Sequence, residues 1–249
     1  ANLTSKDIAS SVALAVNEKH GIWYNPMTGK YHEATIGDKG IQLNLKSGES
    51  RILITSNKPV GEWQLGSKVK VGGKEAIVAA DSKTIDLTEN AWKLSFTEDA
   101  PKVGETFNLK GVKSWEGLSE KAKVMMGTGV YETTIKLSKD DAKKQWAIDL
   151  GDVRESARVY VNNKYIGCAW AVPYILNCKD ALNKGKNTIR IEVTNLPANR
   201  IAEMDRQGVK WRKMKEINVV DINYKKTTYE KWTPMPSGLN STVKLVEIK

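Results

Sequence analysis

The sequence predicts an all-β protein, in which a sandwich or barrel of strands follows a small β module. Apolar and polar side chains alternate with a period of two in several short runs, which places the apolar set on one face of each strand. Glycine and asparagine residues separate these runs, as expected for turns. Segments with a helical period are scarce. A chain of 249 residues with 40% hydrophobic residues can bury a sizeable core.

The alternating runs occur in both halves of the chain, and one face of each is expected to meet the core. Trp92 and Trp115 also fit the strand pattern, so we expect both in the core together with Trp146. The inward positions of the predicted strands are Ile41, Leu43 and Leu45; Tyr131, Thr133, Ile135 and Leu137; Trp146, Ile148 and Leu150; Val159 and Val161; and Ile189, Ile191 and Val193.

Turns and short helices are predicted between some of these strands. Asn162-Asn163 predicts a tight hairpin, because asparagine tolerates the positive φ that such turns require. Residues 5–16 fit either one amphipathic helix or a strand, since valine favours strands. Residues 139–144 and 180–182 each fit a short helical turn or a loop.

A change of composition near Pro59 divides the chain into two predicted domains. Residues 1–60 are expected to form the small β module, and residues 61–249 the sandwich. The strand pattern becomes continuous from Trp92 onward. We find no internal repeat and no low-complexity segment.

The net charge of +10 would suit acidic partners such as nucleic acid or anionic glycans. Motifs that accompany nucleic-acid binding are missing, so a lysine-rich solvated surface is the preferred interpretation and no nucleic-acid partner is predicted. No apolar run approaches the ~20 residues of a membrane-spanning helix, so no membrane span is predicted.

The two cysteines, Cys168 and Cys178, form no Cys-x-x-Cys pair, and neither has a histidine nearby. A zinc site is therefore not expected. They fit two buried thiols or one disulfide that closes a short loop, and thiols are preferred because two cysteines in this length are no disulfide framework.

Residues 92–193 carry a resemblance to a known family. Its parts are the run Trp-Lys-Leu-Ser-Phe from Trp92, the Gly-x-Gly-x-Tyr-x-Thr segment from Gly127, and Asp149-Leu150-Gly151. These parts are followed by a loop that contains aromatic residues and proline, and then by a glycine-x-asparagine turn that precedes a strand. These segments resemble the sugar-binding jelly roll of glycoside hydrolase family 2. The remaining matching residues are Ala157 to Asn163, Gly167, Trp170, Pro173, Tyr174, Leu182, Gly185, Asn187, Ile189, Ile191 and Val193.

Further segments are similar to the family 106 α-L-rhamnosidase group. Thr194 to Arg200 (TNLPANR) resembles its C-terminal domain, and Tyr24 to Gly29 with Leu45 to Ser50 resembles the small β module before the jelly roll. The resemblance implies the C-terminal β-sandwich region of a glycoside hydrolase, with a galactose-binding-like jelly roll and no catalytic barrel in this sequence. Asn163 stands where that family has glycine, and Met126 where it has serine.

The candidate carbohydrate-binding residues are aromatic and polar side chains in inferred loops. Sugar rings stack on aromatic faces while polar groups fix their hydroxyls. The alternative is that the tryptophans pack and that Arg200 braces a loop. The candidates are Trp170, Tyr174, Asn199, Arg200, Asp205 and Trp211.

No catalytic residue is predicted. Glycoside hydrolysis needs two facing carboxyl groups, and the sequence indicates no pairing among Glu116, Glu132, Glu203 and Asp205. Nucleophile-elbow, phosphate-loop and zinc-protease motifs are also missing from the sequence. The metal content is left open: the resemblance allows a structural calcium ion, but no acidic loop indicates its ligands. No other cofactor is expected.

The expected function is therefore a non-catalytic, carbohydrate-associated region of a rhamnosidase-like or family 2-like glycoside hydrolase. Its expected partners are carbohydrate and the catalytic domain of the same parent protein. The resemblance implies a secreted, periplasmic or cell-surface location. A stand-alone carbohydrate-binding module and a purely structural interaction domain are the alternatives, and catalysis by this chain itself is a third.

Overall fold

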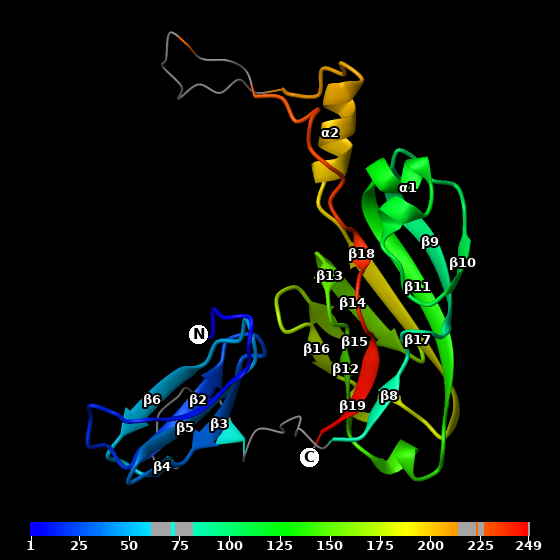
Figure 1. Cartoon of the computed structure of the whole chain (residues 1–249). Coiled ribbons are helices and arrows are strands. Elements are labelled where there is room, and N and C mark those ends of the chain that lie inside the picture. The colour runs from blue at the N-terminus through cyan, green and yellow to red at the C-terminus, as the bar shows by residue number, and fades with distance from the viewer. Residues whose placement is uncertain (61–70, 73–81, 214–222, 224–226, 249) are drawn as a thin grey trace. The chain divides into compact units, whose positions relative to one another are not determined.

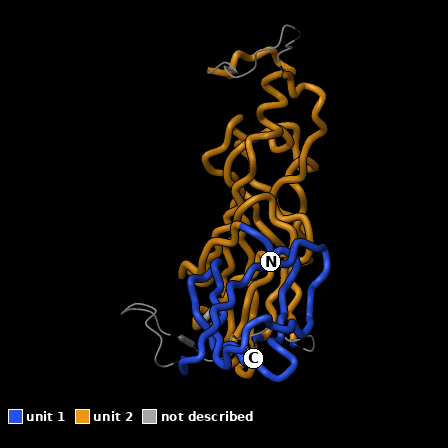
Figure 2. The backbone as a smooth tube through the Cα atoms, turned by 90° about the vertical axis from the view of Figure 1, so that its left-hand side faces the viewer, with its two compact units in different colours: residues 1–82, 171–173, 248–249 blue, residues 83–170, 174–247 orange. Residues whose placement is uncertain are grey.

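The computed structural model describes residues 1–60, 71–72, 82–213, 223 and 227–248. The chain forms two compact units, shown in Figure 2. Residues 1–82 with 171–173 and 248–249 make the first, and residues 83–170 with 174–247 make the second. The predicted boundary between residues 60 and 61 lies at the edge of the described residues and stays a prediction.

In the described residues of the first unit, the strands form two small sheets, of three and four strands. Buried Ile41 and Leu45 alternate with exposed Gln42 and Asn44, as the sequence predicts. The helical alternative for residues 5–16 is wrong, because Ile8–Val12 pairs with Gly40–Leu45 as an antiparallel strand. The sheets are β1 (Ile8–Val12), β5 (Gly40–Leu45) and β4 (Ile36–Gly37), and β6 (Ile52–Ser56), β2 (His20–Asn25), β3 (Lys30–Ala34) and β7 (Val71–Gly72).

The second unit is a β-sandwich with a six-stranded antiparallel sheet on one side (Figure 1). From edge to edge, that sheet contains β10 (Phe107–Lys110), β9 (Ala91–Ala100), β11 (Met126–Leu137), β17 (Gly185–Thr194), β14 (Ser156–Val161) and β15 (Lys164–Ala169). The other side contains β16 (Ile175–Asn177), β12 (Trp146–Asp149), β19 (Lys244–Glu247) and β8 (Thr84–Asp86), with the short pair β13 (Val153–Arg154) and β18 (Gly238–Leu239).

A single buried cluster fills the space between these sheets. It joins Ile191 of β17 to Ile148 of β12, which makes the two sheets one hydrophobic unit. Trp92, Trp115 and Trp146 are all buried in it, so the predicted aromatic core is confirmed, although Trp115 lies in a 3-10 turn (Trp115–Gly117) and not in a strand. The fold is therefore the all-β sandwich that the alternation predicts.

The predicted turns are also confirmed. Asn162 and Asn163 adopt φ values of 50° and 65° in the hairpin between β14 and β15. Short 3-10 turns over Asp141–Lys143 and Lys179–Ala181 occupy the two segments where the sequence allows a helical turn.

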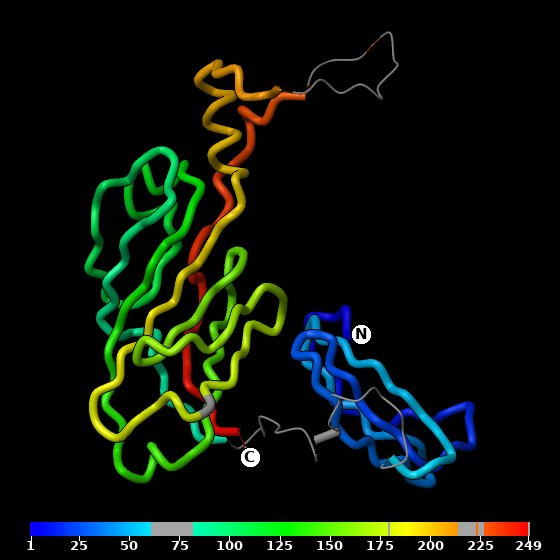
Figure 3. The backbone as a smooth tube through the Cα atoms, turned by 180° about the vertical axis from the view of Figure 1, so that it is seen from behind, coloured from blue at the N-terminus to red at the C-terminus, as the bar shows by residue number. Residues whose placement is uncertain are grey.

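Two α-helices go beyond what the sequence predicts. Helix α1 (Glu120–Val124) precedes β11, and helix α2 (Ala198–Arg206) follows β17. The two helices contact each other at one end of the sandwich (Figures 1 and 3). Neither they nor the short 3-10 turns of the described residues are long and apolar enough to span a membrane.

Candidate functional site

The predicted sugar-contact residues occupy two separate parts of the second unit. Trp170 and Tyr174 lie in the connection from β15 to β16, whereas Asn199, Arg200 and Asp205 lie on α2. Figure 1 shows α2 at one end of the sandwich and β15 and β16 away from it. The prediction that the second group lies in a loop is wrong, because these residues form a nine-residue helix.

Trp170 and Tyr174 differ in what they offer a ligand. Trp170 is 61% exposed, so its indole faces are available for stacking. Tyr174 is half-buried against the core cluster, and its carbonyl oxygen accepts a hydrogen bond of 2.9 Å from the Leu150 amide. Burial, followed by the nearby Glu155 and Asp152 carboxylates, raises the pKa of the Tyr174 hydroxyl. Tyr174 therefore packs, and Trp170 is the freer of the two rings.

Asn199 has a structural role on α2. Its side chain is buried, Nδ2 donates to the Met235 carbonyl at 2.8 Å, and Oδ1 accepts from the Met235 amide at 2.8 Å. This two-way contact attaches the segment before β18 to the helix. Because the side chain is buried and bonded at both ends of its amide, Asn199 holds the fold together and is not accessible to a sugar.

Asp205 and Trp211 form part of an aromatic cluster at the end of α2. The Asp205 carboxylate accepts from Trp211 Nε1 at 2.7 Å and from the Tyr229 amide at 2.8 Å. Tyr229 in turn lies 4.5 Å from Trp232, centroid to centroid, and 6.4 Å from Trp211. The three rings, Trp211, Tyr229 and Trp232, are called the α2 aromatic cluster below.

The α2 aromatic cluster is partly exposed and lies beside a guanidinium group. Trp232 is 48% exposed, and the Arg212 guanidinium lies 5.0 Å and 5.2 Å from the ring centres of Trp211 and Tyr229. Arg206 donates to the Glu230 carbonyl at 3.1 Å. An exposed group of rings with fixed polar neighbours suits a sugar or another protein surface.

Arg200 lines a shallow hollow of about 600 Å³ between α1 and α2. Glu203, also in its lining, accepts from Arg206 and Gln207 at 2.9 Å and 2.7 Å. The hydrogen bond from Arg206 lowers the pKa of Glu203. A general acid for glycoside hydrolysis needs a raised pKa, so Glu203 is ionised and unsuited to that role.

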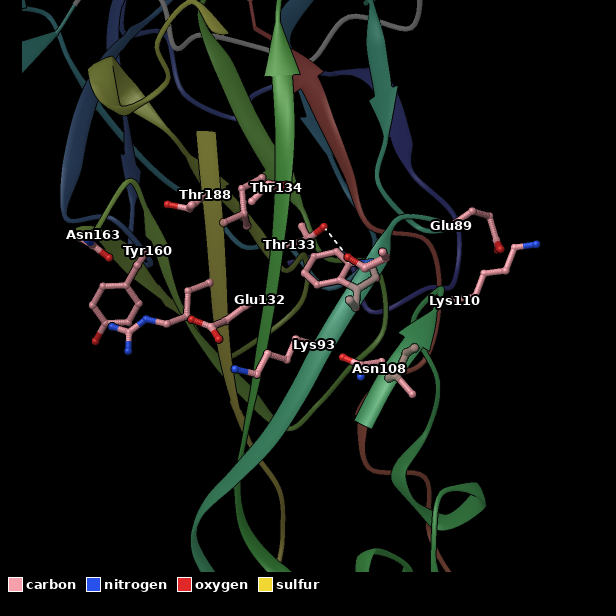
Figure 4. A pocket seen from close by; sticks show the side chains of 15 residues that line it. Glu89, Lys93, Asn108, Lys110, Glu132, Thr133, Thr134, Tyr160, Asn163 and Thr188 are labelled. Atoms are coloured by element: carbon pink, nitrogen blue, oxygen red, sulfur yellow. Dashed lines mark hydrogen bonds between the residues drawn. The ribbon is translucent and has the colours of Figure 1, made fainter. Parts of the chain in front are cut away.

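A larger hollow, of about 790 Å³, lies on the outer face of the six-stranded sheet. Strand register aligns five of its lining side chains in one line across five strands: Asn108 of β10, Lys93 of β9, Glu132 of β11, Arg190 of β17 and Tyr160 of β14. We call these five residues the cross-strand row. Figure 4 shows Tyr160 and Asn163 at one side of the hollow, Glu89 and Lys110 at the other, and Glu132 and Lys93 between them.

The alternation in the sequence does not reveal this hollow. Each residue of the cross-strand row is an outward position of its strand, and the alternation predicts that such positions face solvent. Outward Tyr160 and Arg190 are nevertheless partly buried, which only register can show. Arg190 covers the Tyr160 ring at 4.0 Å and pairs with Glu192 at 2.9 Å.

In the described part of the chain, no group of three or more His, Cys, Asp or Glu side chains is placed to hold a metal ion. Cys168 and Cys178 are both free thiols, as preferred from the sequence.

Comparison with known proteins identifies the sandwich. Residues 118–236 match the family described as glycosyl hydrolase 2 galactose-binding domain-like. The matched segment spans just under half of the chain, and it is similar to the galactose-binding-like domain of that family. The match covers strands β11, β14 and β17 and both groups of predicted sugar-contact residues.

Two relatives extend the likeness beyond the galactose-binding-like domain. A putative beta-glucuronidase of Formosa agariphila is 26% identical over 83% of this chain and 20% of its own length. The structure of a rhamnosidase from Novosphingobium sp. PP1Y has a TM-score of 0.69 at 23% identity, over 98% of this chain and 22% of that one. The second likeness shows that the fold is shared across both units.

A beta-glucuronidase of Bifidobacterium dentium, solved with coumarin-3-O-glucuronide, gives a TM-score of 0.48 at 16% identity, over 68% of this chain and 31% of that one. The present chain spans about one fifth of the Formosa and Novosphingobium proteins.

Proposed function

We propose that this chain is a non-catalytic accessory region of a glycoside hydrolase, which supports the catalytic domain of the same parent protein and contacts its glycan. The observation that carries the proposal is the galactose-binding-like domain match, in a chain that aligns with about one fifth of two larger proteins named as glycosidases. Rhamnosidase-like and glucuronidase-like parents both fit these names. Proteins that share a fold can catalyse different reactions. The fold therefore does not decide which of the two substrates the parent protein hydrolyses, and both stay part of the proposal.

The carboxylates of the chain support the non-catalytic part. Asp205 is occupied by the Trp211 indole and the Tyr229 amide, and Glu203 by Arg206 and Gln207. Ser114 donates to Glu116. Three of the four carboxylates considered from the sequence therefore serve as hydrogen-bond acceptors within the fold, which is the role of structural acids.

The α2 aromatic cluster is the proposed contact with the glycan or with the catalytic domain's cleft, together with Arg200 and, separately, Trp170. Asp205 fixes the Trp211 indole and Arg206 bonds the backbone carbonyl of Glu230, so little freedom is lost when a flat partner stacks on the cluster. We also propose that the parent acts outside the cytoplasm, which cell fractionation would test.

The proposal is tested by assaying the 249-residue chain on 4-nitrophenyl β-D-glucuronide and 4-nitrophenyl α-L-rhamnoside. We expect no hydrolysis above the buffer rate. Hydrolysis that disappears in a Glu203→Gln or Glu132→Gln variant would assign the chemistry to this chain and overturn the accessory role.

A further inference from the structure

The side chains of the sheet-face hollow are polar but have few partners within the protein. Lys93, Lys110 and Glu132 make no ion pair with any described residue, and the Asn108 side chain makes no hydrogen bond with one. The hydroxyls of Thr134, Thr188 and Tyr160 also make no hydrogen bond with any described residue. A hollow lined by free donors and acceptors is suited to a ligand that carries many hydroxyl groups.

The charges of the hollow nearly cancel. Lys93 and Lys110 face Glu89 and Glu132 within the same lining, and Arg190 is neutralised by Glu192 at 2.9 Å. For a polyanion or a polycation alike, attraction to two of these charges is offset by repulsion from the other two, so neither gains net electrostatic attraction here. The lining therefore favours a neutral ligand, in contrast to the net charge of +10 of the whole chain.

An aromatic surface continues the cross-strand row at the β15 edge. Tyr160 pairs in register with Tyr165, the two ring centres are 5.3 Å apart, and Tyr165 is 54% exposed. Arg190 covers one face of Tyr160 and fixes its position. A pyranose ring can stack on the exposed Tyr165 while neighbouring units of the same chain reach the polar groups further along the row.

We propose that the outer face of the six-stranded sheet binds a neutral oligosaccharide, laid across the strands from Tyr165 and Tyr160 toward Asn108. Glu132 accepts hydrogen bonds from sugar hydroxyls at the middle of the row, and Lys93 and Asn108 donate to others. This site is separate from the α2 aromatic cluster. The inference goes beyond the proposed function, which places the glycan contact at α2 and Trp170 and assigns no ligand to this sheet face.

The test is binding of neutral and acidic oligosaccharides to the 249-residue chain, first on a printed array and then by calorimetry with the neutral probe that gives the strongest signal. We expect saturable binding of a neutral probe. Glu132→Ala should weaken it roughly tenfold or more, since a hydrogen bond to a charged group is worth about 1.5–3 kcal/mol. Tyr160→Ala should weaken it by a similar factor.

The matched control is Lys136→Ala. Lys136 is exposed on the same strand and the same face as Glu132, and it lies outside the hollow. It should bind as the unaltered chain does, whereas Trp211→Ala reports separately on the α2 aromatic cluster. Thermal unfolding of each variant checks that the sheet is intact. Binding of acidic probes alone, binding lost in Trp211→Ala but kept in Glu132→Ala, or no neutral probe bound would each overturn the proposal. None of these results bears on the hydrolysis assay, which tests the accessory role.

Discussion

The indole Nε1 of Trp115 donates a hydrogen bond of 2.7 Å to the hydroxyl of Tyr131, and both residues are fully buried. The same hydroxyl accepts from the Leu239 amide at 3.2 Å. One oxygen on β11 therefore satisfies donors from the segment before α1 and from β18. The contact connects three segments of the second unit that are distant in sequence.

Tyr131→Phe should lower the free energy of unfolding by about 2 kcal/mol or more, because it leaves two buried donors without an acceptor. Urea unfolding monitored by tryptophan fluorescence measures this. Tyr165→Phe is the control, because Tyr165 is exposed and its hydroxyl makes no hydrogen bond in the described structure. A change below about 0.5 kcal/mol for Tyr131→Phe would show that the hydroxyl is dispensable.

Gly238→Ala should prevent the second unit from folding stably. Gly238 has a φ of 89°, and a Cβ there would meet Trp115 Nε1 and the Tyr131 hydroxyl. Gly104→Ala is the matched control, because Gly104 has a φ of 74° but open space around it. We expect the control to cost about 1–2 kcal/mol from backbone strain alone. Soluble yield and thermal unfolding compare the two, and equal stability would contradict the close approach of Gly238 to the two aromatic side chains.

Stability should fall as the solution becomes alkaline. Burial raises the pKa of the Cys178 thiol to about 12 from its ordinary value of 9.0, so the folded state holds a proton that the unfolded chain releases. This contribution is complete below pH 9, decreases above it, and is lost as the pH passes the folded value. Burial also raises the pKa of the Tyr131 hydroxyl, which acts in the same direction.

Urea unfolding between pH 8 and pH 11 measures the alkaline effect. In Cys178→Ala the decrease with pH should be shallower, whereas Cys168→Ala should behave as the unaltered chain. At pH 8 iodoacetamide should modify the partly exposed Cys168 and leave buried Cys178 unmodified until urea is added. Rapid modification of Cys178 in the folded protein would contradict its burial.

Asn199→Ala should release the segment around Met235 from α2, because both hydrogen bonds to the Met235 backbone are lost. Hydrogen exchange of peptides that contain Met235 should become faster, with a loss of about 1–3 kcal/mol in local stability. Gln207→Ala, on an exposed position after the same helix, is the control. Unchanged exchange at Met235 would show that the segment is held by other contacts.

The sandwich is predictable because burial enforces the period of two. Tyr131, Ile135 and Leu137 are buried while Glu132 and Lys136 are exposed, which is the pattern seen in the sequence. Helix α2 escapes prediction because it is short and polar, although Pro197 before it and the spacing of Ala198, Ile201 and Ala202 are helix signals.

The candidate sites are harder to predict than the fold. The sequence places Asp205 and Trp211 among the same group of candidates, and a hydrogen bond of 2.7 Å joins them. The contributions of Tyr229 and Trp232 depend on a return of the chain toward α2 that no local pattern reveals. The cross-strand row depends on the register of five strands, and register is set by long-range pairing.

Strand β19 lies between β12 and β8, so the second sheet has residues from opposite ends of the unit side by side. During synthesis on the ribosome, β8 and β12 emerge long before the strand that must separate them. Until residues 244–247 arrive, both carry an unpaired edge beside an incomplete core. Closure of the sandwich therefore waits for almost the whole unit to be synthesised.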